Sequence, residues 1–169
     1  MSKGRHPGLL LNKKKGFTLI EILVALGILS VLMAVAVPYA QMSLKRAKES
    51  ELTASLRVIR TAIDGFYKDY KEGKISKMCD CASEFGYPKN LLVLVEGVST
   101  GDAVEKKLKY LRRIPANPFE RQDIPAHEQW GLRSYADSWD SWSWSGEDVY
   151  DVFAKTDRKA IDGSDYASW

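Results

Sequence analysis

The sequence predicts an α+β protein in which one long N-terminal helix packs on a small C-terminal antiparallel sheet with short helices. Three patterns predict this fold. An apolar run covers residues 17–37, apolar residues then recur every three or four positions up to residue 70, and short alternating segments follow near the C-terminus. Spacings of three and four indicate helix, whereas alternation indicates strands. The patterns divide the chain into residues 1–16, 17–37, 38–72 and 73–169.

Composition and charge exclude several classes of protein. The 169 residues are 45% hydrophobic and 28% charged, which excludes a disordered chain and a collagen-like fibre. A net charge of +3 is too small to predict a nucleic-acid partner. Residues 1–16 hold five of the 25 Lys and Arg and no acid, which leaves 20 basic against 22 acidic side chains in the rest. The basic character therefore belongs to the first 16 residues.

The apolar run at residues 17–37 predicts a single membrane crossing. Its 21 residues contain one charge, that of Glu21. As a helix they span about 30 Å, the thickness of the hydrocarbon core of a bilayer. Basic residues before the run stay in the cytoplasm, so the chain after about residue 38 faces the other side of the membrane. A secretory signal peptide cut after Ala34-Val35-Ala36, a plain anchor and a buried core helix are the alternatives.

Glu21 argues for more than anchoring. An ionised carboxylate inside a bilayer costs about 2.5–3.5 kcal/mol near its centre, so such a residue is a functional hypothesis by default. In the first turn of a helix it also gains from the helix dipole, by less than about 1 kcal/mol at an exposed site. That local gain does not explain an acid placed in lipid.

The segment from Lys13 to Glu21, KKKGFTLIE, resembles the processing site of type IV prepilins and of the pseudopilins of type II secretion. The resemblance implies that a prepilin peptidase removes a leader ending in Lys13-Lys14-Lys15-Gly16 and methylates the new N-terminus at Phe17. It also implies that Glu21 pairs with the N-terminal amine of a neighbouring subunit as the chain forms a homopolymer. Pro38 lies where this family tends to carry a helix-kinking proline.

Beyond the membrane, apolar residues repeat along one helix face. They are separated by four or three positions, which predicts one helix from residue 17 to about 72, loosened at Pro38 and Gly27. We expect this face to be the seam on which the globular head packs. The residues of the repeat are Leu52, Leu56, Ile59, Ile63, Phe66 and Tyr70.

The head, residues 73–169, is predicted to hold short helices followed by two strands. One helix is expected to open near Pro88 and stop at Gly97, and another to cover residues 102–111. The strands are expected at residues 130–135 and 149–153. Cys79 and Cys81 lie two residues apart and are not expected to close on each other; oxidation by small thiols and pairing between subunits both stay open.

All five tryptophans lie in the last 40 residues. Three of them, Trp139, Trp142 and Trp144, alternate with Ser and Asp over residues 138–145. Such a tract predicts either an exposed aromatic surface for a partner or a sugar, or a roof over a thin sheet.

Blocks of the head resemble the major, G-type pseudopilin of type II secretion. They are Tyr87-Pro88 with its Leu-rich continuation, Tyr110-Leu111, Pro115 to Pro118, and Ile161 to Trp169. Asn117 and Phe119-Glu120 depart from the family pattern, as does the stretch at 120–146. The resemblance implies a possible structural calcium ion in the C-terminal loop. Its candidate ligands are Asp157, Asp162 and Asp165, since calcium prefers carboxylate and carbonyl oxygens.

No motif indicates an enzyme: the sequence has no Ser-His-Asp order, no phosphate-binding glycine loop and no His cluster. The prediction is a pseudopilin of the inner membrane. It is cut by prepilin peptidase and polymerised by an assembly platform, with minor pseudopilins, into a periplasmic filament for protein export. The alternatives are a type IV pilin of a surface filament (adhesion, motility, DNA uptake) and a single-pass anchored binding module. No partner among nucleic acids is expected.

Overall fold

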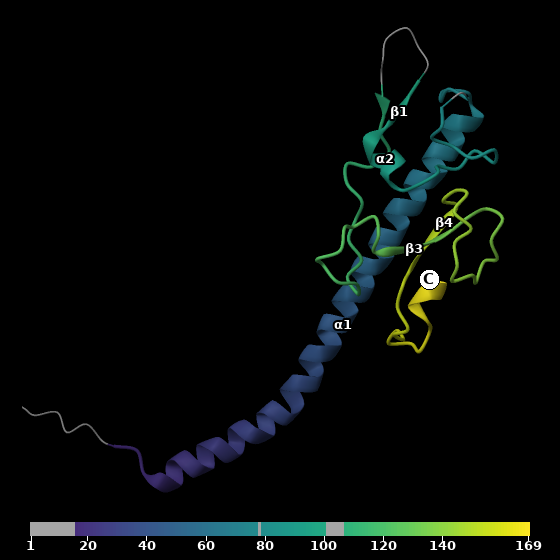
Figure 1. The fold of residues 1–169 in the computed structure, drawn as a ribbon. Helices are drawn as coiled ribbons and strands as arrows, with labels where there is room; N and C mark the ends of the chain where they lie inside the picture. The colour runs from purple at the N-terminus through teal and green to yellow at the C-terminus, as the bar shows by residue number, and fades with distance from the viewer. Residues whose placement is uncertain (1–15, 78, 101–106) are drawn as a thin grey trace, which may run out of the picture. The chain divides into compact units, whose positions relative to one another are not determined.

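The computed structural model describes residues 16–77, 79–100 and 107–169, and these residues form an α+β fold as predicted (Figure 1). The chain divides into two compact units, residues 1–42 and residues 43–169. The first helix begins in one unit and ends in the other. In chain order the elements are α1 (Leu19–Lys71), α2 (Leu92–Glu96), β1 (Val98–Ser99), β2 (Lys107–Leu108), β3 (Trp130–Arg133), β4 (Asp151–Ala154) and η1 (Tyr166–Ser168).

The described part of the first unit is a short non-helical stretch, residues 16–18, followed by helix. Helix α1 starts at Leu19 and continues through Gly27 and Pro38. Every residue from 16 to 44 is exposed to solvent. The apolar run is therefore helical from Leu19 onward, and no other residue that the structure describes covers it.

The second unit has its own hydrophobic core, built on the predicted face of α1. Leu52, Ile59 and Phe66 are fully buried, and Leu56 and Ile63 nearly so. They pack with core residues from several later segments of the head. Those partners include Leu91, Leu94, Trp130, Val149, Val152 and Tyr166.

The two predicted strands are present and pair with each other. Strands β3 and β4 run antiparallel, with Trp130 opposite Ala154 and Arg133 opposite Asp151. The residues of both strands lie within the predicted segments, apart from one residue at the end of β4. The Trp130 indole is buried, and its Nε1 donates a hydrogen bond to the carbonyl of Pro115 at 2.9 Å. The strand pair is thereby fixed to the loop before it.

The predicted helix over residues 102–111 is wrong at its described end. Lys107 and Leu108 form β2, which pairs antiparallel with β1. Gly97 adopts φ +84 after α2 and turns the chain into β1, where Val98 is buried opposite Leu108. Backbone pairing between distant residues thus overrides the local helix pattern. The rest of the predicted helix lies outside the described residues.

Cys79 and Cys81 do pair with each other, contrary to the sequence prediction. They form a disulfide across a Cα–Cα distance of 5.1 Å. The expectation assumed an extended chain, in which neighbouring side chains point to opposite faces. Instead, Asp80 and Cys81 lie in a turn, and the Cys81 amide donates a hydrogen bond to the Cys79 sulfur at 3.2 Å. The turn brings the two thiols together.

Gly131 is the position in the sheet where we expect the largest effect of a single added methyl group. A Cβ at Gly131 would lie 2.3 Å from Cζ of Phe153, its partner across the strands. Overpacking of this kind costs about 1–3 kcal/mol. We therefore expect Gly131→Ala to lower the free energy of unfolding by that amount in a denaturant titration.

Gly65→Ala is the matched control for that variant. Its Cβ would lie 3.5 Å from the Tyr110 ring, an ordinary contact, and alanine favours helix by about 1 kcal/mol over glycine. Stability should be unchanged or higher. Equal stability of Gly131→Ala and the unmodified chain would show that Phe153 can move aside at no cost.

Candidate processing and assembly site

The start of α1 holds a reciprocal cap formed by Thr18 and Glu21. The Glu21 amide donates a hydrogen bond to Thr18 Oγ1 at 3.3 Å, and the Thr18 amide donates one to Glu21 Oε2 at 3.5 Å. This is the arrangement of a capping box, which satisfies two backbone donors that the first helical turn leaves without partners. Glu21 therefore helps to start the helix within its own chain.

Glu21 was among the predicted site residues, whereas Thr18 was not. The signal was present, because Thr18-Leu19-Ile20-Glu21 has the Thr-x-x-Glu spacing of a capping box. The cap also matters for the predicted cut, since the residues before Thr18 lie outside the helix. Gly16 and Phe17 are exposed, and the Phe17 side chain is 79% exposed. A peptidase can therefore reach the bond between Gly16 and Phe17 without unwinding α1.

The residue before the predicted cut has room around it in this chain. A Cβ built on Gly16 would meet no atom within 4 Å. Nothing in the described structure therefore requires glycine at this position for folding. The basic leader residues Lys13, Lys14 and Lys15 lie outside the described residues.

One helix among the described residues is long and apolar enough to cross a bilayer, and it is α1. Its apolar window lies near the N-terminus and is not buried at all within the chain. This arrangement is consistent with a single-pass membrane anchor. Glu21 lies in the first turn of the helix, close to one end of that apolar window.

The C-terminal loop is held to α1 by Glu49. Its Oε1 accepts hydrogen bonds from the Ile161 amide at 2.8 Å and from the Tyr166 hydroxyl at 2.7 Å. Burial raises the pKa of Tyr166 well above its ordinary value, and the bond to Glu49 adds to that effect. The hydroxyl therefore stays protonated and keeps donating to the carboxylate.

The three predicted calcium ligands are engaged separately or exposed. Asp162 Oδ1 accepts hydrogen bonds from Oγ and the amide of Ser164 at 2.7 and 2.9 Å, and these bonds lower the pKa of Asp162. Asp165 lies 3.7 Å from Lys159 Nζ, and Asp157 is exposed. Across the residues that the structure describes, no group of three His, Cys, Asp or Glu could hold a metal ion.

The residues present thus do not form a metal cage in this geometry, and calcium binding stays a prediction. It is tested by whether calcium raises the melting temperature of the protein. If the C-terminal loop holds the ion, Asp162→Ala removes that rise.

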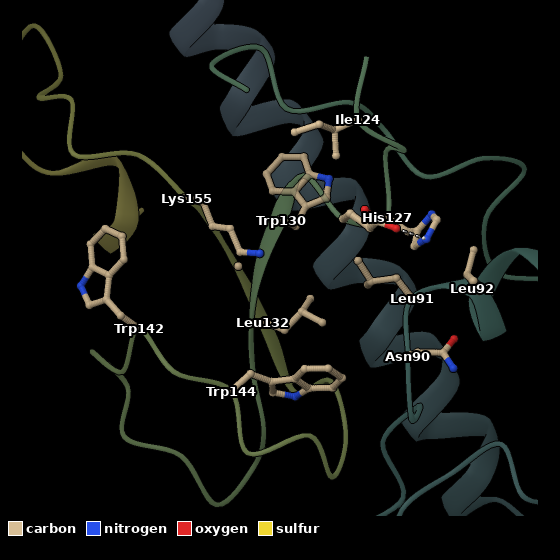
Figure 2. Close-up of a pocket in the computed structure, with 12 residues that line it drawn as sticks. Asn90, Leu91, Leu92, Ile124, His127, Trp130, Leu132, Trp142, Trp144 and Lys155 are labelled. Atoms are coloured by element: carbon tan, nitrogen blue, oxygen red, sulfur yellow. Dashed lines mark ion pairs between the residues drawn. The ribbon is translucent and has the colours of Figure 1, made fainter. Parts of the chain in front are cut away.

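The tryptophan tract is exposed rather than a buried roof. Trp139 is 80% exposed, Trp142 58% and Trp144 40%. Trp142 and Trp144 line a hollow that is also lined by residues near α2 and β3 (Figure 2). The described geometry therefore favours the exposed aromatic surface over the roof.

Fold and site together define a class of protein: a small α+β head on a long helix whose first half is apolar and uncovered. Comparison with known families and proteins agrees with this class. Residues 11–37 match the family model described as the prokaryotic N-terminal methylation motif. Over part of its length the chain is similar to type IV pilins.

Curated relatives resemble part of the chain. It is 39% identical over 61 residues to the type IV major fimbrial protein FimA of Dichelobacter nodosus, covering 36% of this chain and 39% of that protein. It is 30% identical over 74 residues to fimbrial protein Q of Moraxella bovis, which covers 44% of this chain and 47% of that protein. It is 35% identical over 54 residues to prepilin peptidase-dependent protein D of Escherichia coli K12, covering 32% and 37%.

The chain thus spans less than half the length of these relatives. No solved structure gives a significant match.

Proposed function

We propose that the chain is a filament subunit that is cut between Gly16 and Phe17, methylated on Phe17 and then polymerised. The exposed apolar helix carries this proposal. All side chains of residues 17–42 are exposed, and a monomer can cover so much apolar surface only with lipid. A filament covers it with the same helix of other copies. Lipid before assembly and a homopolymer afterwards are the two partners that this surface requires.

Processing by prepilin peptidase is the first step of the proposal. The matched methylation motif at residues 11–37 supports it, as does the name of the Escherichia coli relative, prepilin peptidase-dependent protein D. With the leader in the cytoplasm and one crossing of the inner membrane, the head lies in the periplasm. The proposed role is structural, and none of its steps requires a catalytic residue in this chain.

The finer proposal is the periplasmic pseudopilus of a type II secretion system. Its support is the head, where Tyr87-Pro88 precedes α2 and the segment from Pro115 to Pro118 follows β2, in the order of the G-type pseudopilin. In this role the subunit meets an inner-membrane assembly platform and minor pseudopilins, and the growing filament drives protein export.

A surface type IV pilin is the second candidate. The names of the relatives favour this candidate, because these relatives are called fimbrial proteins and pilins. Such a filament leaves the cell and serves adhesion, motility or DNA uptake. The family model matches residues 11–37, the processing segment that the sequence shares with both kinds of filament. The names of the relatives and the pattern of the head thus favour different filaments.

Cell fractionation separates the two candidates. In cells that express the chain at its natural level, filaments are sheared from the surface and the chain is measured in sheared and periplasmic fractions. A pseudopilin stays in the periplasm, and its deletion stops export of folded proteins. A pilin is recovered from the sheared fraction, and export continues. A chain recovered only as a monomer in the membrane fraction, and in neither of the other two, contradicts the filament proposal.

A further inference from the structure

A hollow of about 640 Å³ lies on the head between the tryptophan tract, the residues before α2, and strand β3. Figure 2 shows Trp142 at the left, Asn90 and His127 at the right and Trp144 below the centre, with the Lys155 side chain between Trp142 and Trp130. Its apolar floor includes Trp130 and Leu132 of β3. The hollow lies entirely within residues 43–169. The filament role proposed above does not use it.

The loop that carries the tryptophans is pinned rather than loose. Buried Arg133 donates a hydrogen bond from Nε to the Ser141 carbonyl at 2.9 Å. The Trp144 Nε1 donates to the Asp148 carbonyl at 2.6 Å, and Asp148 is itself buried. Trp142 packs edge-on against Phe153 with the ring centroids 5.5 Å apart. The exposed rings are therefore held in place before any ligand arrives, which lowers the entropy that binding loses.

The polar groups of the hollow suit a ligand with many hydroxyls and a negative charge. Asn90 uses Oδ1 to accept from the Val93 amide, which leaves its Nδ2 to donate. His127 Nε2 lies 3.5 Å from Glu128 Oε1, and both side chains add polar atoms to the lining of the hollow. Lys155 is exposed and forms no ion pair or hydrogen bond with any residue in the described ranges. It is thus a cation available to an anionic group beside the Trp142 ring.

We propose that this hollow binds an acidic oligosaccharide. The C–H face of a sugar ring stacks on Trp142, the sugar hydroxyls bond to Asn90 and Glu128, and a uronic carboxylate pairs with Lys155. The volume fits a ligand site, which usually measures about 300–1,000 Å³. A stable protein partner would instead need a surface of about 800 Å² on each side. The size and mixed lining of the hollow therefore favour a sugar over a second protein.

The test uses the processed chain, residues 17–169, in a detergent without a sugar headgroup. Tri-galacturonate and the neutral cellotriose are titrated separately, and binding is followed by tryptophan fluorescence and calorimetry. We expect saturable binding of tri-galacturonate, at least about fivefold tighter than that of cellotriose. Lys155→Ala should remove this preference and leave the affinity for the neutral sugar unchanged.

Two tryptophan variants of the same loop locate the site. Trp142→Ala should weaken binding of both sugars by about tenfold or more. Trp139→Ala is the matched control, because Trp139 is more exposed but does not line this hollow, and it should bind as the unmodified chain does. If Trp142→Ala fails to fold, Trp142→Phe keeps an aromatic face and should bind with intermediate affinity.

Several results would overturn the proposal. They are no saturable binding of either sugar, equal loss of binding in the Trp139 and Trp142 variants, and an acid preference that survives Lys155→Ala. Self-association of the chain that Trp142→Ala abolishes, without sugar binding, would assign the surface to a second copy. Because the assay uses unpolymerised protein, its result is independent of whether the chain forms filaments.

Discussion

Gly16→Leu is expected to leave the chain at its precursor mass. The residue before the proposed cut has to let a peptidase approach the backbone closely, which glycine permits because it has no Cβ. A side chain forced into a tightly packed site costs about 1–3 kcal/mol, which slows cleavage by about five- to 150-fold. Intact-mass measurement of membrane-extracted protein should show residues 1–16 retained and Phe17 without its methyl group.

This effect can be assigned to the peptidase because the chain itself tolerates the change. A Cβ on Gly16 meets nothing within 4 Å, so no fold defect is expected. Gly27 has the same open surroundings but lies inside α1, away from the cut. Gly27→Leu is therefore the matched control and should be processed normally. Cleavage of Gly16→Leu at the normal rate, or normal maturation in cells without the peptidase, would contradict the proposed cut.

Periodic patterns in the sequence predicted those parts of the fold whose burial depends on local spacing. The face from Leu52 to Phe66 is buried because residues three and four positions apart share one side of a helix. Strands β3 and β4 form where short apolar segments were found, but their burial does not alternate: three of the four residues in each strand are buried. For helix α1 the pattern and the packing express the same geometry, whereas for the strands the apolar content rather than strict alternation was the signal.

Elements that depend on distant partners were not predictable in this way. Leu108 becomes a strand residue only because Val98 lies opposite it, and a two-residue strand leaves no periodic pattern to find. The Cys79–Cys81 disulfide depends on a turn rather than on the spacing of the cysteines. The hollow at Trp142 joins residues about 50 positions apart, such as Asn90 and Trp142. The sequence indicated its aromatic rings but not its polar wall.

Glu21→Gln is expected to stop filament formation while leaving helix α1 intact. Under the proposed function, the Glu21 carboxylate pairs in the assembled filament with the α-amine that cleavage creates on Phe17 of a neighbour. Removing one partner of a buried ion pair costs about 3–5 kcal/mol, because the other charge stays buried without a counter-ion. The critical concentration for polymerisation should therefore rise by at least about a hundredfold, as measured by sedimentation of processed protein.

The capping box allows the local and intersubunit roles of Glu21 to be separated. Glutamine also serves as the third helical residue of a capping box, so Glu21→Gln removes the charge and keeps the cap. Thr18→Ala does the reverse: it removes the hydroxyl that accepts from the Glu21 amide at 3.3 Å and keeps the charge. Loss of the cap costs about 0.5–2 kcal/mol at the start of the helix. Circular dichroism in detergent should show less helix for Thr18→Ala and no change for Glu21→Gln.

The two variants then give opposite results for the two roles. If charge pairing between subunits governs assembly, Thr18→Ala still forms filaments and Glu21→Gln does not. If Glu21 acts mainly as a cap, Glu21→Gln assembles normally and Thr18→Ala is impaired. The second pattern would remove the intersubunit pair from the proposal. Glu21 would then be a helix-starting residue that tolerates the membrane because its carboxylate accepts the Thr18 amide hydrogen bond in the first turn.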